Sequence, residues 1–169
     1  MIDLSQWTGA IFSTDRVFRY VLWRRFKAGN RFMNCLMLNP STATDVKFDP
    51  TVKRCAGRAA TLGYDGLIVT NLYAFRSPYP QILVDRGYPV GDSNNVYIAA
   101  AAELSEIILC GWGNRAEKDR AADVIKMLMC LEHGSKFRCL STNKDGSPAH
   151  PLYLPYSQNL KQWNPNGGG

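Results

Sequence analysis

Residues 32–42 read FMNCLMLNPST, and this stretch decides the fold that the chain is expected to adopt. The segment 32–38 is apolar apart from Asn34, and such a run predicts a strand that is buried on both faces of a sheet. Pro40 ends the strand, because proline has no backbone N–H to donate to a neighbouring strand. The polar residues that follow lie beyond the carboxyl end of the strand, which is where open α/β sheets bind their ligands.

Apolar segments that alternate with helical patterns predict the rest of the sheet. Further strands are expected at 66–73, 106–113 and 136–141, and helices at 50–62, 92–104 and 115–131. Asp49 is the expected N-cap of the first helix and Pro50 its first residue. The alternation predicts a three-layer α/β/α sandwich with a mainly parallel central sheet of about four strands.

The segments around this core complete the predicted architecture. Residues 19–26 are expected to form an outer, antiparallel N-terminal strand, joined to strand 32–38 as a hairpin by a Gly-containing turn. Residues 76–93 hold three prolines and two glycines, and this composition predicts a long loop. A single α/β domain is expected over 1–169, with a disordered tail at about 164–169.

Composition narrows the classes of partner. The 20 lysines and arginines outnumber the 14 acidic residues, which favours an anionic partner such as a nucleotide or DNA. No apolar run is long enough to cross a membrane and no signal peptide begins the chain, so a cytoplasmic protein without a membrane partner is expected. The five cysteines contain no C-x-x-C pair, and the two histidines stand far apart, so neither a metal nor a cofactor is expected.

An asparagine recurs where each predicted central strand ends, at Asn39, Asn71, Asn114 and Asn143. Right-handed crossovers bring the carboxyl ends of parallel strands to one edge of a sheet, so these groups are expected to meet. The expected ligand-binding residues are Pro40, Ser41, Thr42, Arg54, Asn71, Tyr73, Arg76, Gly111, Trp112, Asn114, Asn143 and Lys144. Tyr73 and Trp112 offer rings for stacking, whereas the alternative for both is core packing.

Three residues are candidates for catalysis. Asn39 can position a water molecule, Asp49 can act as a general base, and His150 can stabilise charge on a leaving group. Each has a structural alternative, since Asn39 is a common turn former and Asp49 a helix cap. Asp45 is a weaker candidate for the base.

An uncharacterised bacterial and phage family, domain of unknown function 1643, resembles this chain in the segments 38–43, 49–51, 63–64, 70–73, 110–113 and 143–153 and at Arg76. The order of Asn39-Pro40, Thr70-Asn71-Leu72 and His150-Pro151 is also similar to the uracil-DNA glycosylase superfamily. That second resemblance implies a uracil-DNA-glycosylase-like fold and a nucleobase–sugar bond as the substrate. Ser41 stands where the mismatch-specific branch has glycine, and an insertion at 144–149 precedes His150.

These observations leave different functions open. The first is an N-glycosidase that acts on DNA or on a nucleotide, with base flipping where the substrate is a duplex. The second is a non-catalytic protein that senses or sequesters a nucleotide in the same crevice. The third is a protein–protein interaction module, which predicts an exposed apolar surface instead.

Overall fold

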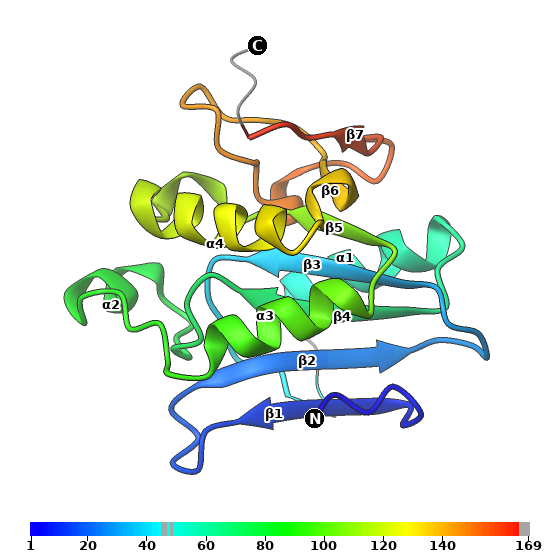
Figure 1. Ribbon diagram of the computed structural model, residues 1–169, viewed down its shortest axis with the longest axis horizontal. Coiled ribbons are helices and arrows are strands. Elements are labelled where there is room, and N and C mark those ends of the chain that lie inside the picture. The colour runs from blue at the N-terminus through cyan, green and yellow to red at the C-terminus, as the bar shows by residue number, and fades with distance from the viewer. Residues whose placement is uncertain (45–46, 48, 166–169) are drawn as a thin grey trace.

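The computed structural model describes residues 1–44, 47 and 49–165, and it contains a seven-stranded mixed sheet with helices on both faces (Figure 1). The strands are β1 (Thr8–Phe12), β2 (Arg19–Arg25), β3 (Phe32–Met37), β4 (Gly66–Asn71), β5 (Ile107–Cys110), β6 (Phe137–Cys139) and β7 (Lys161–Gln162). The α-helices are α1 (Pro50–Thr61), α2 (Pro80–Asp85), α3 (Asn94–Glu103) and α4 (Lys118–Cys130). Short 3-10 turns are η1 (Gly113–Arg115), η2 (Gly134–Lys136) and η3 (Pro151–Tyr153).

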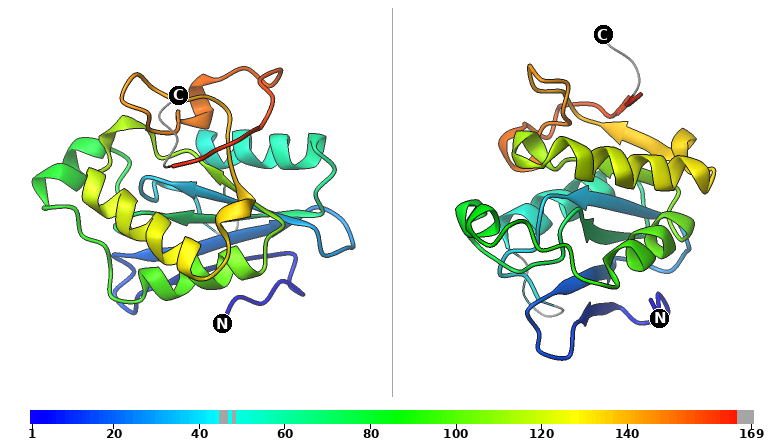
Figure 2. Two further views of the ribbon diagram at one scale, coloured as in Figure 1. Left: turned by 45° about the horizontal axis from the view of Figure 1, so that its top comes forward. Right: turned by 60° about the vertical axis from the view of Figure 1, so that its left-hand side comes forward.

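The strand order is β1-β2-β4-β3-β5-β6-β7. The four inner strands β4, β3, β5 and β6 are parallel, whereas β1, β2 and β7 join the sheet antiparallel. The predicted parallel centre of about four strands is therefore confirmed. Both predicted faces are covered as well, with α1 behind the sheet and α3 and α4 in front of it (Figures 1 and 2).

Successive side chains of the strands point to opposite faces of the sheet, so they form two hydrophobic cores. Met33, Cys35 and Met37 of β3 pack with Val52 and Cys55 of α1 on one face. Residues that alternate with them, among them Leu36, Ile108 and Cys110, pack with Ile98 of α3 and Leu128 of α4 on the other face. A strand that is apolar on both faces must lie inside the sheet, which is why β3 occupies its centre.

The predicted hairpin between segments 19–26 and 32–38 is wrong. Strand β2 pairs with β1 and β4, and β4 lies between β2 and β3. Asp65, just before β4, holds the connecting loop across this gap: its backbone O accepts from Phe26 N at 2.8 Å and its Oδ2 from Arg31 N at 2.8 Å. Strand β2 is also not the outermost strand, because β1 covers its free edge.

Two further expectations are corrected by packing. The segment 76–93 contains the short helix α2, which begins at Pro80 and buries Leu83 against the α3 and α4 face of the sheet. Helix α4 begins at Lys118 rather than at residue 115, because 113–115 form a 3-10 turn. The predicted tail at 164–169 falls largely outside the described residues, as does Asp45.

The strand order reverses at β3, which positions the site. The chain passes from β3 through α1 to β4 on one side, and then through α3 to β5 on the other side of β3. Crossovers on opposite faces leave a crevice beyond the carboxyl end of the central strand. Residues 38–41, 71–77, 111–115 and 148–153 surround this end of the sheet.

Arg58 ties the C-terminal segment to α1. Its Nη2 donates to Pro155 O at 2.6 Å and to Leu154 O at 3.0 Å, and its Nη1 donates to Gln158 O at 3.2 Å. The side chain is buried, so these carbonyls replace the water that the guanidinium loses. Arg54, one turn earlier, only lies over the Tyr156 ring, 4.4 Å from its centroid.

We expect Arg58→Met to lower the free energy of unfolding by about 2–4 kcal/mol, because several charge-assisted hydrogen bonds are lost together. Arg54→Met, on the same helix, removes one partly exposed cation–π contact of about 0.5–1 kcal/mol. Urea unfolding followed by circular dichroism measures both. Equal losses for the two variants contradict the role given to Arg58.

Candidate functional site

A cavity of about 340 Å³ opens at the carboxyl ends of the parallel strands. Its walls come from four separate exits of the sheet: Asn39 and Ser41 after β3, Asn71 at the end of β4, Trp112 to Arg115 after β5, and His150 to Tyr153 after β6. The first residues of α1 close a further side. We call this space the Asn39 cavity. Its volume is at the lower end of the roughly 300–1,000 Å³ that is typical of small-molecule sites.

Asn39 is held rigidly at this edge. Its Nδ2 donates to Ser77 O at 3.1 Å, to Pro40 O at 3.1 Å and to Phe75 O at 3.4 Å. These carbonyl acceptors assign the orientation of the amide, so Oδ1 is the group left to accept a hydrogen bond. Within the described residues, Oδ1 has no partner, and Asn39 can therefore orient a water molecule or a donor of a ligand.

Asp49 serves as the predicted N-cap of α1. Its Oδ1 accepts from Val52 N at 2.8 Å, and Pro50 is the first helical residue. The residue is buried and lines the Asn39 cavity. One carboxylate oxygen is thus used by the helix, while Oδ2 has no hydrogen bond among the described residues. The structural and the functional interpretations of Asp49 are compatible, because they use different oxygens.

His150 is set up as a neutral hydrogen-bond donor. Its Nδ1 accepts from Leu152 N at 3.3 Å, so a neutral imidazole carries its proton on Nε2. Burial lowers the pKa of His150, which opposes the charged form, while the negative charge of Asp49 acts in the other direction. The exposed Tyr153 ring lies 5.5 Å from the imidazole, centroid to centroid, and lines the same cavity.

Arg19 is a cavity residue that the sequence pattern did not reveal. It lines the Asn39 cavity although it is only 1% exposed, and its Nη1 donates to Ala43 O at 2.7 Å. Burial lowers its pKa to about 10, so the guanidinium is still charged at neutral pH, helped by the attraction of Asp49. An arginine at the start of a strand gives no sign of such burial. Arg115 and Tyr153, which are both exposed, were also missed, because they lie in short 3-10 turns with no local sign of a site.

The structure brings together only part of the predicted set. Asn39, Asp49 and His150 share the cavity with Ser41, Asn71, Trp112 and Asn114. The predicted residues that do not line it are Pro40, Thr42, Arg54, Tyr73, Arg76, Gly111, Asn143 and Lys144. Distant strand exits do converge, whereas the cations predicted to bind the ligand, Arg54, Arg76 and Lys144, do not line the cavity.

Three of the predicted residues that do not line the cavity make polar contacts elsewhere in the protein. Tyr73 is fully buried and its hydroxyl meets Glu117, so its ring cannot stack on a ligand in the cavity, and desolvation raises its pKa to about 12. Arg76 donates to Arg16 O at 3.0 Å. Asn143 donates through Nδ2 to Ser147 Oγ at 3.0 Å, closing the turn that precedes His150.

Gly111 has a packing role instead of the predicted ligand contact. A Cβ atom at this position would lie 2.7 Å from Pro151 Cδ and 3.3 Å from Met37 Sδ. The missing side chain lets the His150-Pro151 segment lie against the end of β5. Gly111 therefore positions His150 without lining the cavity itself.

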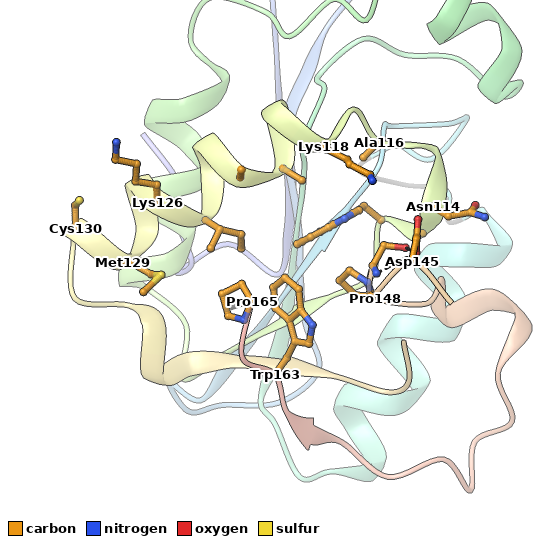
Figure 3. Close-up of a pocket in the computed structure, with 17 residues that line it drawn as sticks. Asn114, Ala116, Lys118, Lys126, Met129, Cys130, Asp145, Pro148, Trp163 and Pro165 are labelled. Carbon is orange, nitrogen blue, oxygen red and sulfur yellow. Dashed lines mark hydrogen bonds between the residues drawn. The ribbon is translucent and has the colours of Figure 1, made fainter. Parts of the chain in front are cut away.

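A second cavity, of about 800 Å³, lies between α4 and the C-terminal segment (Figure 3). Trp163, Pro148 and Pro165 form its apolar wall, while Lys118 and Lys126 project from α4 at its rim (Figure 3). Trp112 lines both cavities, and its ring packs edge-on against Trp163 at 5.4 Å between centroids. One side of the predicted stacking ring is therefore already taken by another side chain.

Other classes of site find no support in the described part of the chain. No cluster of three or more His, Cys, Asp or Glu side chains there has the arrangement of a metal site. None of the helices described has the length and apolarity that a bilayer span requires. Cys35, Cys110 and Cys139 are buried as free thiols, as expected for strand residues.

Comparison with known families finds one match, and it covers most of the chain. The model of the family described as Protein of unknown function (DUF1643) matches residues 19–152. No curated protein and no solved structure matches the sequence. The match runs from Arg19, at the start of β2, to Leu152, and so includes every residue that lines the Asn39 cavity except Tyr153.

We expect Gly111→Ala to displace the His150-Pro151 segment, because the new methyl group overlaps the Pro151 ring. The loss of stability is about 1–3 kcal/mol, typical of overpacking a buried site. Hydrogen exchange of the backbone N–H of Leu152, which donates to His150 Nδ1, should become faster than in the parent. Gly146→Ala is the control: its φ of 81° strains the substitution, yet nothing lies near the new methyl group. Unchanged exchange at Leu152 in Gly111→Ala contradicts this packing role.

We expect acid to destabilise the protein partly through His150. Since burial lowers the folded-state pKa below the ordinary 6.5, the unfolded chain binds the proton more readily. This contribution to stability is complete above pH 6.5 and is lost as the pH falls below that value. Urea unfolding at several pH values should show a shallower loss for His150→Gln than for the parent. Parallel curves for the two proteins contradict the burial argument.

Proposed function

The chain belongs to this DUF1643 family, and we propose that it recognises a nucleotide in the Asn39 cavity and hydrolyses its nucleobase–sugar bond. The observation that carries the proposal is the meeting of a water-orienting amide, a carboxylate and a neutral imidazole donor around one small cavity. Asn39, Asp49 and His150 are brought there by three different elements. Hydrolysis of an N-glycosidic bond needs these chemical roles.

The proposed reaction is a displacement by water. Asn39 Oδ1 orients the water molecule, and the free oxygen of Asp49 accepts its proton as the water oxygen bonds to the anomeric carbon. The bond between that carbon and the base nitrogen breaks, and its electron pair leaves with the base. His150 Nε2–H donates a hydrogen bond to an oxygen of the departing base, where the negative charge develops. The proton held by Asp49 then neutralises the base, which leaves a free base and a sugar with a new hydroxyl group.

A neutral histidine suits this role. Its low pKa keeps Nε2–H as a donor without placing a full positive charge in the cavity. Tyr153 offers an exposed aromatic ring beside the imidazole, a surface on which a base can stack. These two features support the recognition of a flat, oxygen-bearing ring.

A second candidate is a nucleotide-binding protein without catalysis. It is favoured by the fact that Asp49 already uses one oxygen to cap α1. The same cavity then senses or sequesters its ligand, and ligand binding does not depend on the carboxylate charge.

We expect the purified protein to release free base from at least one 2′-deoxynucleoside 5′-monophosphate or from DNA that contains uracil or a mismatch. Asp49→Asn retains the cap, since asparagine caps helices equally well, and should lower the rate by about 10²–10⁴. His150→Gln should lower the rate strongly as well. Asp119→Asn, which alters an exposed carboxylate on α4, is the matched control. Chromatography of the released base is the measurement.

The outcomes separate the two candidates. Binding of a nucleotide without release of base, unaffected by Asp49→Asn, identifies the non-catalytic protein. Neither binding nor release with any of these substrates overturns the proposed function.

A further inference from the structure

Arg19 is a buried cation with unused hydrogen-bonding capacity. Its one side-chain hydrogen bond among the described residues runs from Nη1 to Ala43 O, and its Nε is buried without a partner. No carboxylate in the described part of the chain forms an ion pair with it, although Asp49 attracts it from further away. Burying an arginine in this way lowers the stability of the folded protein unless an acceptor or an anion pairs with its guanidinium group.

Arg58 shows what a purely structural arginine looks like in this protein. It is also buried, yet its two terminal nitrogens reach four backbone carbonyls between residues 154 and 158. Both arginines leave Nε buried without a partner, but the terminal nitrogens of Arg58 have four backbone acceptors, whereas those of Arg19 have one among the described residues. The difference coincides with position, because Arg19 lines the Asn39 cavity and Arg58 does not.

Asn71 adds a second unsatisfied donor to the same cavity. The residue is 1% exposed, and its Nδ2 is buried without a hydrogen-bond partner. Its backbone O accepts from Asn94 Nδ2 at 2.9 Å, which anchors the end of β4. Arg19 and Asn71 therefore place two unpaired donors beside one cavity, where an acceptor on a bound ligand would satisfy both.

The position of the other cations restricts what that acceptor is. The cations that line the cavity are the buried Arg19 and the exposed Arg115. Arg54, Arg76 and Lys144, which were expected among the ligand-binding residues, lie outside it. A bound strand needs repeated contacts along its backbone. The described cavity instead offers one enclosed cation.

We propose that Arg19 and Asn71 form a subsite for the terminal phosphate of a nucleoside monophosphate, so that the ligand of the Asn39 cavity is a free mononucleotide. This inference rests on the proposed function and names its substrate class. The guanidinium fork matches two phosphate oxygens, and the amide donates to a third. A terminal phosphate can enter an enclosed subsite, whereas an internal phosphate carries chain on both sides. The positive end of α1 offsets part of the repulsion from Asp49.

The test compares inorganic phosphate, a set of 2′-deoxynucleoside 5′-monophosphates and the matching 2′-deoxynucleosides by isothermal titration calorimetry. We expect a monophosphate to bind the parent protein about 10- to 100-fold more tightly than its nucleoside, as charge-assisted hydrogen bonds imply. Inorganic phosphate alone should bind weakly and compete. Arg19→Met should abolish the preference, and Arg19→Lys should retain only part of it.

Arg31→Met is the charge-matched control, since Arg31 lies just before β3, at the opposite end of the strand from the cavity. Asn71→Asp, nearly the same shape, replaces a donor with a negative group and should weaken phosphate binding while the fold is kept. It therefore gives an answer even where Arg19→Met does not fold. Circular dichroism checks each variant.

Equal affinities for nucleoside and monophosphate, or phosphate binding that Arg19→Lys and Asn71→Asp leave unchanged, overturn the subsite and leave the proposed function standing. An oligonucleotide without a terminal phosphate that binds as tightly as the monophosphate also overturns it. Arg19-dependent binding of phosphate to which no nucleobase adds affinity supports the subsite and overturns the proposed function.

Discussion

Parallel pairing of β3 with both β4 and β5 is the constraint on which the remaining structure depends. The two neighbours are reached through helices on opposite faces of the sheet, so no helix crosses the carboxyl end of β3. Backbone hydrogen bonds from Leu72 N to Met37 O and from Gly111 N to Leu36 O hold the three strand ends level. The polar exits of these strands are thereby forced into one small volume, although they are far apart in the sequence.

Stability and function draw on the same kind of group in this protein, a buried polar side chain, and the surroundings decide which purpose it serves. Arg58 and the Nδ2 of Asn39 meet backbone carbonyls and hold loops in place. Arg19 and Asn71 keep buried donors that the fold leaves unpaired. These two donors belong to residues that line the Asn39 cavity, where an acceptor on a ligand would satisfy them.

Asp49 illustrates how one residue can satisfy both demands. Its N-cap bond lies at the start of α1, where the helix dipole also favours a negative charge. The same residue lines the cavity with His150 and Arg19, and its negative charge acts to raise the pKa of both. The residue that caps α1 therefore also supplies a carboxylate to the cavity.

Local signals predicted what depends on neighbours in the chain. The cap at Asp49, the proline that begins α1 and the apolar core strands follow from backbone chemistry and periodicity, and all are found. Local patterns gave a wrong prediction where strands pair with partners that are distant in the sequence. Residues 19–38 have the pattern of a hairpin, yet β4 lies between β2 and β3. Likewise Tyr73, which follows a strand like the cavity residues, points into the core against Glu117.

The amino-acid sequence by itself determined the α/β class, the parallel centre of the sheet and the polar strand exits, because these rest on hydrophobic alternation and on short-range caps and turns. Only the tertiary structure decided which exits share a cavity, that Arg19 is buried beside them, and that Arg54, Arg76 and Lys144 are not. The physical reason is that burial and pairing of a side chain are set by elements distant in sequence, and no local pattern records them.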